Sequence, residues 1–363
     1  MTKDRLLSLD VFRGLTIAAM ILVNDPGSWS YVYSPLLHAK WHGCTPTDLI
    51  FPFFLFMVGM AVSLGSPKSG EARVQITKKI LKRTLYLILI GLFLNGFPYF
   101  ELSTLRFPGV LQRIGLVFFA IALMHHYVSS KGQVIIGTSL LIGYWVLISF
   151  IPVPGIGEPN VMPDTNFAAW FDRLFLSGHM WSISKTWDPE GLLSTIPAIG
   201  TGLLGIFAGQ LLFKAEDKTD GLIKVFVLGN LLIVLALMWE MDFPINKSLW
   251  TSSFVLYTGG IAMNCFGVLY WLLDILKYRT KITFPFEVFG SNAITAYALS
   301  GILASLFGII PLANSSIHQV LFDGLVDIFD NNHFASLIYA IAFVTLCYLP
   351  VFILYKKKIF IKV

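Results

Sequence analysis

Residues 335–355 read ASLIYAIAFVTLCYLPVFILY, a run of 21 residues without a charged side chain. A helix rises about 1.5 Å per residue, so a run of this length spans roughly the 30 Å hydrocarbon core of a bilayer. A soluble domain would interrupt such a run with charges much sooner. The run therefore predicts a transmembrane helix and sets the class of the whole chain.

Further apolar runs of similar length recur along the sequence. The chain has 363 residues, of which 56% are hydrophobic and 13% charged, about half the roughly 25% charge of an ordinary soluble domain. We predict an all-α, polytopic integral membrane bundle of about ten transmembrane helices, formed by one membrane-embedded domain over residues 1–363. The predicted spans are 8–24, 48–65, 84–100, 108–128, 133–151, 191–213, 222–239, 250–273, 284–306 and 335–355. The amphipathic stretch 307–334 is left outside the count, as a re-entrant or surface segment.

The basic residues of the loops predict the orientation. They fall on one side of a ten-span arrangement, and the positive-inside rule makes that side the cytoplasm. These residues are Lys3, Arg5, Lys68, Arg73, Lys78, Lys79, Lys82, Arg83, Lys214, Lys218, Lys224, Lys277, Arg279, Lys281, Lys356, Lys357 and Lys358. Both termini are therefore expected in the cytoplasm, and the net charge of +5 reflects topology and a lipid bilayer as partner, not nucleic acid.

No cleavable signal, disulfide framework or metal site is indicated. The first apolar run is followed by Asn24-Asp25-Pro26 and not by a small-residue cleavage site. Cys44, Cys265 and Cys347 lie far apart and lack ligand-type spacing.

Polar residues in so apolar a chain are the candidates for function. Asp10 and Arg13 stand three residues apart at the start of the first span, so they share a helix face and can form an ion pair. Asn24 ends that span, and His38 lies in the aromatic loop that follows. Asp48 falls in the first turn of the second span, where it stabilises the helix dipole or orients His38 as a general base.

Two further polar positions lie inside or near spans. Arg113 sits about one turn inside the fourth span, where it must be paired, with Asp48 as a candidate partner, or bind an anion. Asn264 and Asn292 are expected either to hydrogen-bond between helices or to contact a ligand. The glycine-rich run 200–209 is expected to pack helices closely, because it lacks the lysine and the strand of a phosphate loop.

Several motifs in combination resemble the heparan-α-glucosaminide N-acetyltransferase family of membrane acyltransferases. The resemblance runs nearly end to end. The motifs are LDVFRG (9–14), VN (23–24), HAKWHG (38–43), DLIFPFF (48–54), PGVLQRI (108–114), WDPEGLLSTIP (187–197), NKSLWT (246–251) and GSNA (290–293). Relative to the lysosomal enzyme, the chain lacks a large N-terminal lumenal region and the span that follows it, and it has His42 in place of an asparagine.

The resemblance implies transfer of acetyl from cytoplasmic acetyl-CoA to an amino-sugar acceptor on the other side of the membrane. It carries the family's active histidine over to His38 and the neighbouring asparagine to Asn24. Shorter homologues occur in bacteria, so the expected location is the bacterial cytoplasmic membrane, and a homodimer is compatible with the family. Its known acceptor, a terminal glucosamine of heparan sulfate, is not carried over to this chain.

A mechanism follows from these parts. Histidine titrates near pH 6.5 and is suited to remove the proton of an attacking amine. The amide NH₂ of Asn24 can stabilise the oxyanion, and Asp48 can orient His38. We take Arg13, Arg113, Lys82, Arg83 and Asn292 as candidate contacts to acetyl-CoA, and no metal is required. For Lys82 and Arg83 the competing interpretation is plain positive-inside topology.

Alternatives remain at this stage. His38 acts either only as a base in a ternary complex or by carrying the acetyl group itself. The acceptor can be an amine, or a hydroxyl on a glycan. From other functional classes, a sugar permease would explain polar groups within spans, but no inverted repeat is evident. An envelope scaffold would predict that His38→Ala has no effect.

Overall fold

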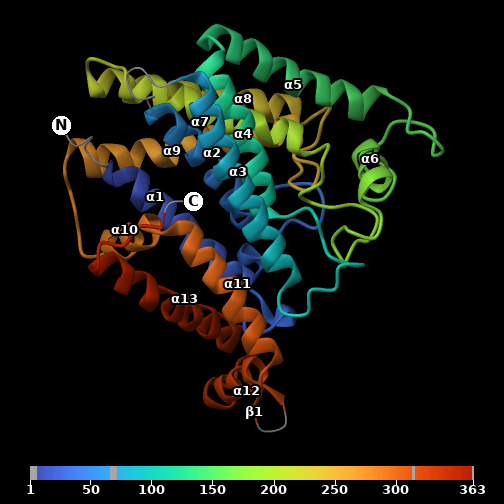
Figure 1. Cartoon of the computed structure of the whole chain (residues 1–363), viewed down its shortest axis with the longest axis vertical. Helices are drawn as coiled ribbons and strands as arrows, with labels where there is room; N and C mark the ends of the chain where they lie inside the picture. The colour runs from blue at the N-terminus through green and yellow to red at the C-terminus, as the bar shows by residue number, and fades with distance from the viewer. Residues whose placement is uncertain (1–5, 66–71, 313–314, 362–363) are drawn as a thin grey trace.

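The computed structural model describes residues 6–65, 72–312 and 315–361, so Lys3, Arg5 and Lys68 lie outside the described residues. The structure is almost entirely helical (Figure 1). The α-helices are α1 (Leu7–Asn24), α2 (Ile50–Leu64), α3 (Arg73–Gly96), α4 (Val110–Tyr127), α5 (Ser130–Phe150), α6 (Phe167–Leu176), α7 (Thr195–Phe213), α8 (Lys218–Trp239), α9 (Ser252–Tyr270), α10 (Thr283–Ser291), α11 (Ala293–Ile309), α12 (Ile317–Phe329) and α13 (Asn332–Lys356). Short helical turns are η1 (Trp29–Tyr31), η2 (Ser34–Leu36), η3 (Pro46–Leu49) and η4 (Trp271–Ile275), the last a π-helical turn that extends α9. Strands β1 (Pro311–Leu312) and β2 (Ser315–Ser316) pair antiparallel.

The membrane bundle predicted from the apolar runs is confirmed. Eight helical segments in the described part of the chain are long and apolar enough to cross a bilayer. They are α1, η3 with α2, α4, α5, α7, α8, α9 with η4, and α13. All ten predicted spans fall on helices, but two of them differ from the prediction.

The predicted span 284–306 is not one helix. It consists of α10 and α11, which meet at an angle of 87°, so the count rises from eight to nine only if this bent pair is one span. The predicted span 84–100 lies on α3, which begins at Arg73 and ends at Gly96. The first half of α3 is basic, which shortens its apolar segment, and α3 is not among the eight helical segments that are apolar enough to cross a bilayer. The count of about ten is therefore reduced.

The stretch 307–334, which lies outside the predicted spans, forms a surface element in the part that the structure describes. After the β1–β2 pair it continues into the amphipathic helix α12, which packs against α13. Leu321, Ile328 and Phe329 of α12 remain exposed. The segment is therefore a short helix beside the bundle and not a further span.

A close crossing of α1 and α10 lies beside the break between α10 and α11. A Cβ atom at Gly14 of α1 would lie 1.7 Å from the carbonyl oxygen of Phe286, and one at Gly290 would lie 1.8 Å from that of Asp10. Only glycine permits the two backbones to come so close. This crossing brings the polar start of α1 against the end of α10.

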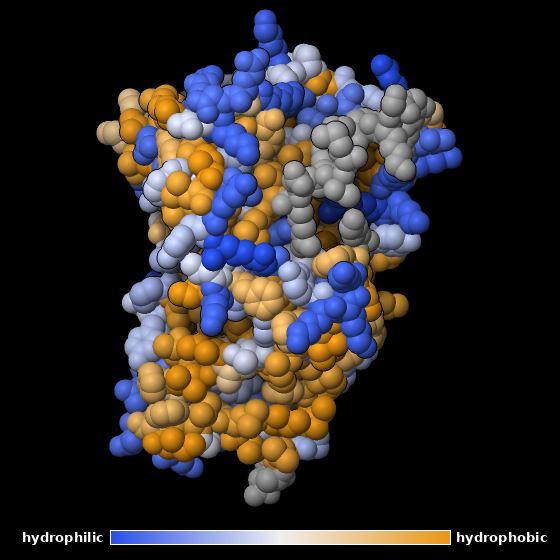
Figure 2. Space-filling model, turned by 90° about the vertical axis from the view of Figure 1, so that its left-hand side faces the viewer, coloured by the Kyte–Doolittle hydropathy of each residue, from blue (hydrophilic) through white to orange (hydrophobic). Residues whose placement is uncertain are grey.

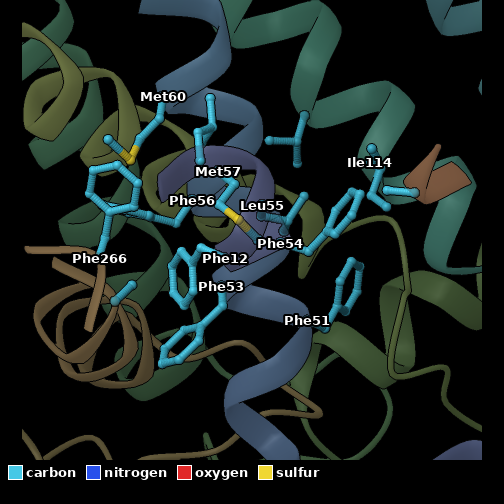
Figure 3. Packing of buried hydrophobic residues seen from close by; sticks show 14 of the residues in the cluster. Phe12, Phe51, Phe53, Phe54, Leu55, Phe56, Met57, Met60, Ile114 and Phe266 are labelled. Atoms are coloured by element: carbon cyan, nitrogen blue, oxygen red, sulfur yellow. The ribbon is translucent and has the colours of Figure 1, made fainter. Parts of the chain in front are cut away.

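The core is centred on α2, whose phenylalanines pack against α1 and α9 (Figure 3). The rings of Phe12 and Phe53 lie 5.4 Å apart, and those of Phe12 and Phe266 6.0 Å apart. On its other side α2 packs on α7, where a Cβ at Gly205 would lie 1.9 Å from the carbonyl oxygen of Phe56. Close helix packing by the glycine-rich run 200–209 is confirmed.

The bundle has two opposite ends, at the left and right of Figure 1. The start of α1 and α10 lie at one end of the bundle, and α6 with its flanking loops lies at the opposite end (Figure 1). Figure 2 looks onto the first of these ends, with hydrophilic residues over its upper half and a hydrophobic area below. That lower half lies at the height of α13 (Figure 1), whose exposed residues include Ile341, Leu349 and Ile353.

Candidate active site

A cavity of about 340 Å³ lies at the end of the bundle that carries α6; we call it the histidine cavity. It is formed by the end of α1, the loop from residue 25 to 47, and the loops before α7 and α9. Its lining residues include Asn24, His38, Lys40, Trp41, Asp48, Arg106, Trp181, Trp187, Glu190, Lys247 and Ser248. All three residues expected to be catalytic, Asn24, His38 and Asp48, therefore line one cavity.

His38 is paired with a buried carboxylate. Its Nδ1 lies 2.7 Å from Oδ1 of Asp48, whose side chain is 1% exposed, whereas the His38 side chain is 46% exposed. A neutral imidazole that donates from Nδ1 to this carboxylate keeps the lone pair of Nε2 as its basic site. The pair has the arrangement of a general base and the group that orients it.

The start of the second span fixes Asp48. Thr45 precedes η3 and Pro46 opens it, and Asp48 Oδ2 accepts hydrogen bonds from the backbone N–H groups of Thr45 (2.9 Å) and Ala39 (3.0 Å). This reciprocal capping explains why the sequence Thr-Pro-Thr-Asp starts the helix here. The same carboxylate thus ties the His38 loop to the helix start.

Lys247 is a third member of this cluster. Its Nζ lies 3.1 Å from Nδ1 and 3.2 Å from Nε2 of His38, and 3.9 Å from Oδ1 of Asp48. Asn24 ends α1 at the same cavity with an exposed side chain. The cavity therefore combines a histidine, a carboxylate, an ammonium group and an amide.

An ion-pair cluster closes another part of the wall. Arg106 donates to Asp188 (2.8 and 2.6 Å) and to Glu190 (2.6 Å). Burial raises the pKa of Glu190, but the pair with Arg106 outweighs this effect and holds the pKa below its usual range. The same pairing holds the pKa of Arg106 above its usual range against the opposing effect of burial. Glu190 and Arg106 therefore stay ionised and act as fixed parts of the wall.

Tryptophan rings line the cavity as well. Trp187 lies edge-on to both Trp41 (5.1 Å) and Trp181 (5.8 Å). Nε1 of Trp41 donates to the carbonyl of Val161 at 2.7 Å, which fixes that ring. Such rigid aromatic faces suit an acceptor with apolar C–H faces and polar edges.

A second and larger cavity of about 700 Å³ lies at the α10 end of the bundle; we call it the arginine cavity. Its lining includes Asp10, Arg13, Arg83, His126 and Ser291. Arg13 lies 3.5 Å from Asp10, which confirms their ion pair, and 3.4 Å from the carbonyl oxygen of Gly290. The guanidinium of Arg83 lies over the ring of Phe118 at 4.5 Å. These cations can bind an anionic group.

An apolar constriction separates the two cavities. A small cavity of about 10 Å³ is lined by Phe54, Ile114 and Ile294, which also line the arginine cavity, and by Met20 and Val110, which also line the histidine cavity. The three cavities therefore lie in series along α1, and the narrow section between the larger two has apolar walls.

Other candidates from the sequence lie elsewhere. Arg113 is fully buried in the first turn of α4, where it donates to the carbonyl of Gly191 (3.1 Å) and to Oγ of Ser194, with Trp250 under its guanidinium at 5.0 Å. Its expected partner was Asp48, but that carboxylate is bound to His38 and the Thr45 cap instead. Arg113 lines neither large cavity.

Asn292 and Lys82 also lie outside both large cavities. Asn292 binds the C-terminal segment through its Nδ2 to the carbonyl of Ile359 (3.1 Å) and its Oδ1 to the N–H of Ile361 (2.8 Å). Lys82 extends over the ring of Tyr86 at 5.6 Å. Of the five residues proposed for acetyl-CoA, only Arg13 and Arg83 line a common cavity. Asn264 hydrogen-bonds to Asn230 of the neighbouring helix, as expected.

Sequence reasoning missed Lys247 and the Arg106 cluster as site residues. A signal was present, because NKSLWT (246–251) and WDPEG (187–191) stand out as motifs. Neither motif indicates, however, that its loop folds back onto the His38 loop. Only the tertiary structure brings Lys247 within contact of a residue 209 positions away.

Comparison with known proteins places this chain in a family. Residues 5–242 match the family model described as heparan-alpha-glucosaminide N-acetyltransferase, catalytic. The heparan-alpha-glucosaminide N-acetyltransferases of Mus musculus and Homo sapiens are 28% and 29% identical, over 100% and 99% of this chain. The chain spans 61% and 60% of the lengths of those two proteins. With a model match over more than half of its length, the chain belongs to the heparan-alpha-glucosaminide N-acetyltransferase catalytic family.

Proposed function

We propose that this protein is a transmembrane acetyltransferase that moves acetyl from cytoplasmic acetyl-CoA to the amine of a glucosamine-like sugar on the opposite side. The observation that carries the proposal is the His38–Asp48 pair in a cavity that an apolar constriction separates from a cavity lined by two arginines. The names of the relatives support an acetyl donor and an amino-sugar acceptor.

The arginine cavity fits the head of the donor. Arg13 and Arg83 can neutralise phosphate groups, and about 700 Å³ is ample space for a nucleotide. It lies beside the start of α3, whose basic residues point to the cytoplasm by the positive-inside rule. A slender pantetheine chain suits the apolar constriction along Met20 and Val110, whereas a nucleotide does not.

The histidine cavity fits the acceptor. Nε2 of His38 removes a proton from the attacking amine, and Asp48 holds the ring and stabilises its charged form. The NH₂ group of Asn24 stabilises the oxyanion that develops on the thioester carbonyl. We favour direct transfer over an acetyl-histidine intermediate, since one base and one donor suffice. The same proposal includes a location in the bacterial cytoplasmic membrane and a homodimeric state.

The test uses the purified protein in detergent with radiolabelled acetyl-CoA and glucosamine. Wild type should form acetylated sugar, and His38→Ala should not. His333→Ala is the matched control, because the His333 ring lies edge-on to Tyr31 and lines neither large cavity. Product from His38→Ala would remove His38 from the centre of the mechanism. Transport of a sugar by wild type in vesicles, without acetylation or binding of acetyl-CoA, would favour the permease.

A further inference from the structure

The loop that carries Lys247 is anchored to the loop that carries His38. Gly43 of the His38 loop donates from its N–H to the carbonyl of Ile245 (2.7 Å) and forms a bridge with Asn246. Asn246 is buried, accepts from the N–H of Leu249 (2.8 Å) and donates from its own N–H to Oγ1 of Thr251 (3.0 Å). The loop therefore fixes the backbone of Lys247 independently of its side-chain charge.

The position of the ammonium group is specific. Nζ lies almost equally far from both ring nitrogens of His38. The lone pair of Nε2 points away from Nδ1, so an atom equidistant from both cannot lie on its axis. Nε2 can therefore still receive a proton from a substrate while Lys247 stays beside it.

Burial makes Lys247 release its proton more readily than an exposed lysine. Its side chain is 18% exposed, and burial lowers its pKa from the ordinary value. Glu190 and Asp48 act in the opposite direction, Arg113 adds to the lowering, and Cys44 opposes it weakly. A lysine with a lowered pKa gives up its proton more readily and can donate it to a thiolate.

We propose that Lys247 is a further catalytic residue, the general acid that protonates the departing thiolate of the acyl donor. This inference rests on the proposed acetyl transfer. The amine nitrogen forms a bond to the thioester carbonyl carbon, and its proton goes to Nε2 of His38. The carbon–sulfur bond breaks, and the sulfur takes a proton from the ammonium of Lys247.

The proton transfers are completed through water. Protonated His38 releases its proton to water and the neutral amine of Lys247 takes one up, because the two side chains are 46% and 18% exposed. The net change is an amine and a thioester converted into an amide and a thiol. No other co-reactant is needed, and both side chains regain their starting protonation states.

The test varies the leaving group. The rate constant kcat/KM is measured for acetyl-CoA and for an acetyl thioester of an acidic aromatic thiol, which needs no protonation to depart. Lys247→Met should lose about 10²-fold or more with acetyl-CoA and less than about 10-fold with the aromatic thioester. Lys247→Arg should show the same difference, since guanidinium keeps the charge but does not release its proton.

Controls separate this inference from the proposed function. Lys40→Met removes an exposed cation from the same cavity and should keep the wild-type ratio between the two thioesters. Equal losses with both thioesters in Lys247→Met and Lys247→Arg would overturn the acid role and leave a positioning residue. If Lys247→Met fails to fold, Lys247→Arg decides alone. A wild type inactive toward both thioesters with glucosamine would overturn the proposed function itself.

Discussion

The histidine cavity and the arginine cavity differ in how their charges are held. In the histidine cavity the charged groups face one another at 2.6–3.9 Å, and segments from four parts of the chain hold them in place. In the arginine cavity, cations project from helices over apolar walls such as Phe118. The first arrangement suits bond-making at one geometry, and the second suits binding of a flexible anionic group. The difference supports the proposal that chemistry takes place at one end and donor binding at the other.

The strongest test of this comparison is the loss of the base. His38→Ala should lower kcat for acetyl transfer by about 10²–10⁴-fold, the usual contribution of a general base. Binding of acetyl-CoA, measured by thermal stabilisation, should stay near wild type, because we propose that its head binds at the other cavity. Loss of donor binding in this variant would contradict the division between the two ends.

The next effect concerns the wall of the histidine cavity. Arg106→Met leaves Asp188 and Glu190 without their counter-charge, and breaking a buried pair costs about 3 kcal/mol or more. We expect a clear fall in the thermal unfolding midpoint in detergent. A midpoint within one or two degrees of wild type would mean that the cluster is not needed to hold the loop.

A pH effect should arise from Asp172 on α6. Burial raises its pKa from 3.8 to about 7, partly offset by hydrogen bonds from Leu192 and Leu193. A raised folded-state pKa gives stability that is full below about pH 4 and is lost as the pH rises to about 7. The expected loss in the free energy of unfolding is about 2 kcal/mol. This is half of the value that the full pKa shift would give, because solvent screens the charge.

The measurement for Asp172 is a difference between two proteins, because other carboxylates titrate in the same range. Asp172→Asn should be more stable than wild type at pH 8 and lose that advantage near pH 4. Its amide oxygen can still accept from Leu192. A variant less stable than wild type at pH 8 would show that the charged form is favoured.

The smallest effect is expected in the arginine cavity. Arg13→Gln with Arg83→Gln should raise KM for acetyl-CoA about tenfold, or about 1.4 kcal/mol, with kcat within about twofold. Lys131→Gln, at the start of α5, removes a cation outside both cavities and serves as the control. A fall in kcat without a change in KM would place these arginines in the chemistry instead.

Much of the site could be predicted because its residues are close in sequence. The sequence Thr-Pro-Thr-Asp predicts a helix start at Asp48. Asp48 is ten positions from His38, so their pairing needs only a short loop. Lys247 and Glu190 could not be assigned, since burial and long-range loop contacts determine their places. Arg113 was assigned a wrong partner for the same reason.

The sequence by itself determined the membrane bundle, because apolar runs as long as a bilayer is thick have no alternative to a spanning helix. It also determined the His38 loop and the ion pair of Asp10 with Arg13, which depend on local spacing. Only the tertiary structure decided the 87° break at Asn292, the two cavities and their constriction, and the contact of Lys247 with His38. Those features arise where helices cross and distant loops meet, and hydropathy along one chain carries no information about such crossings.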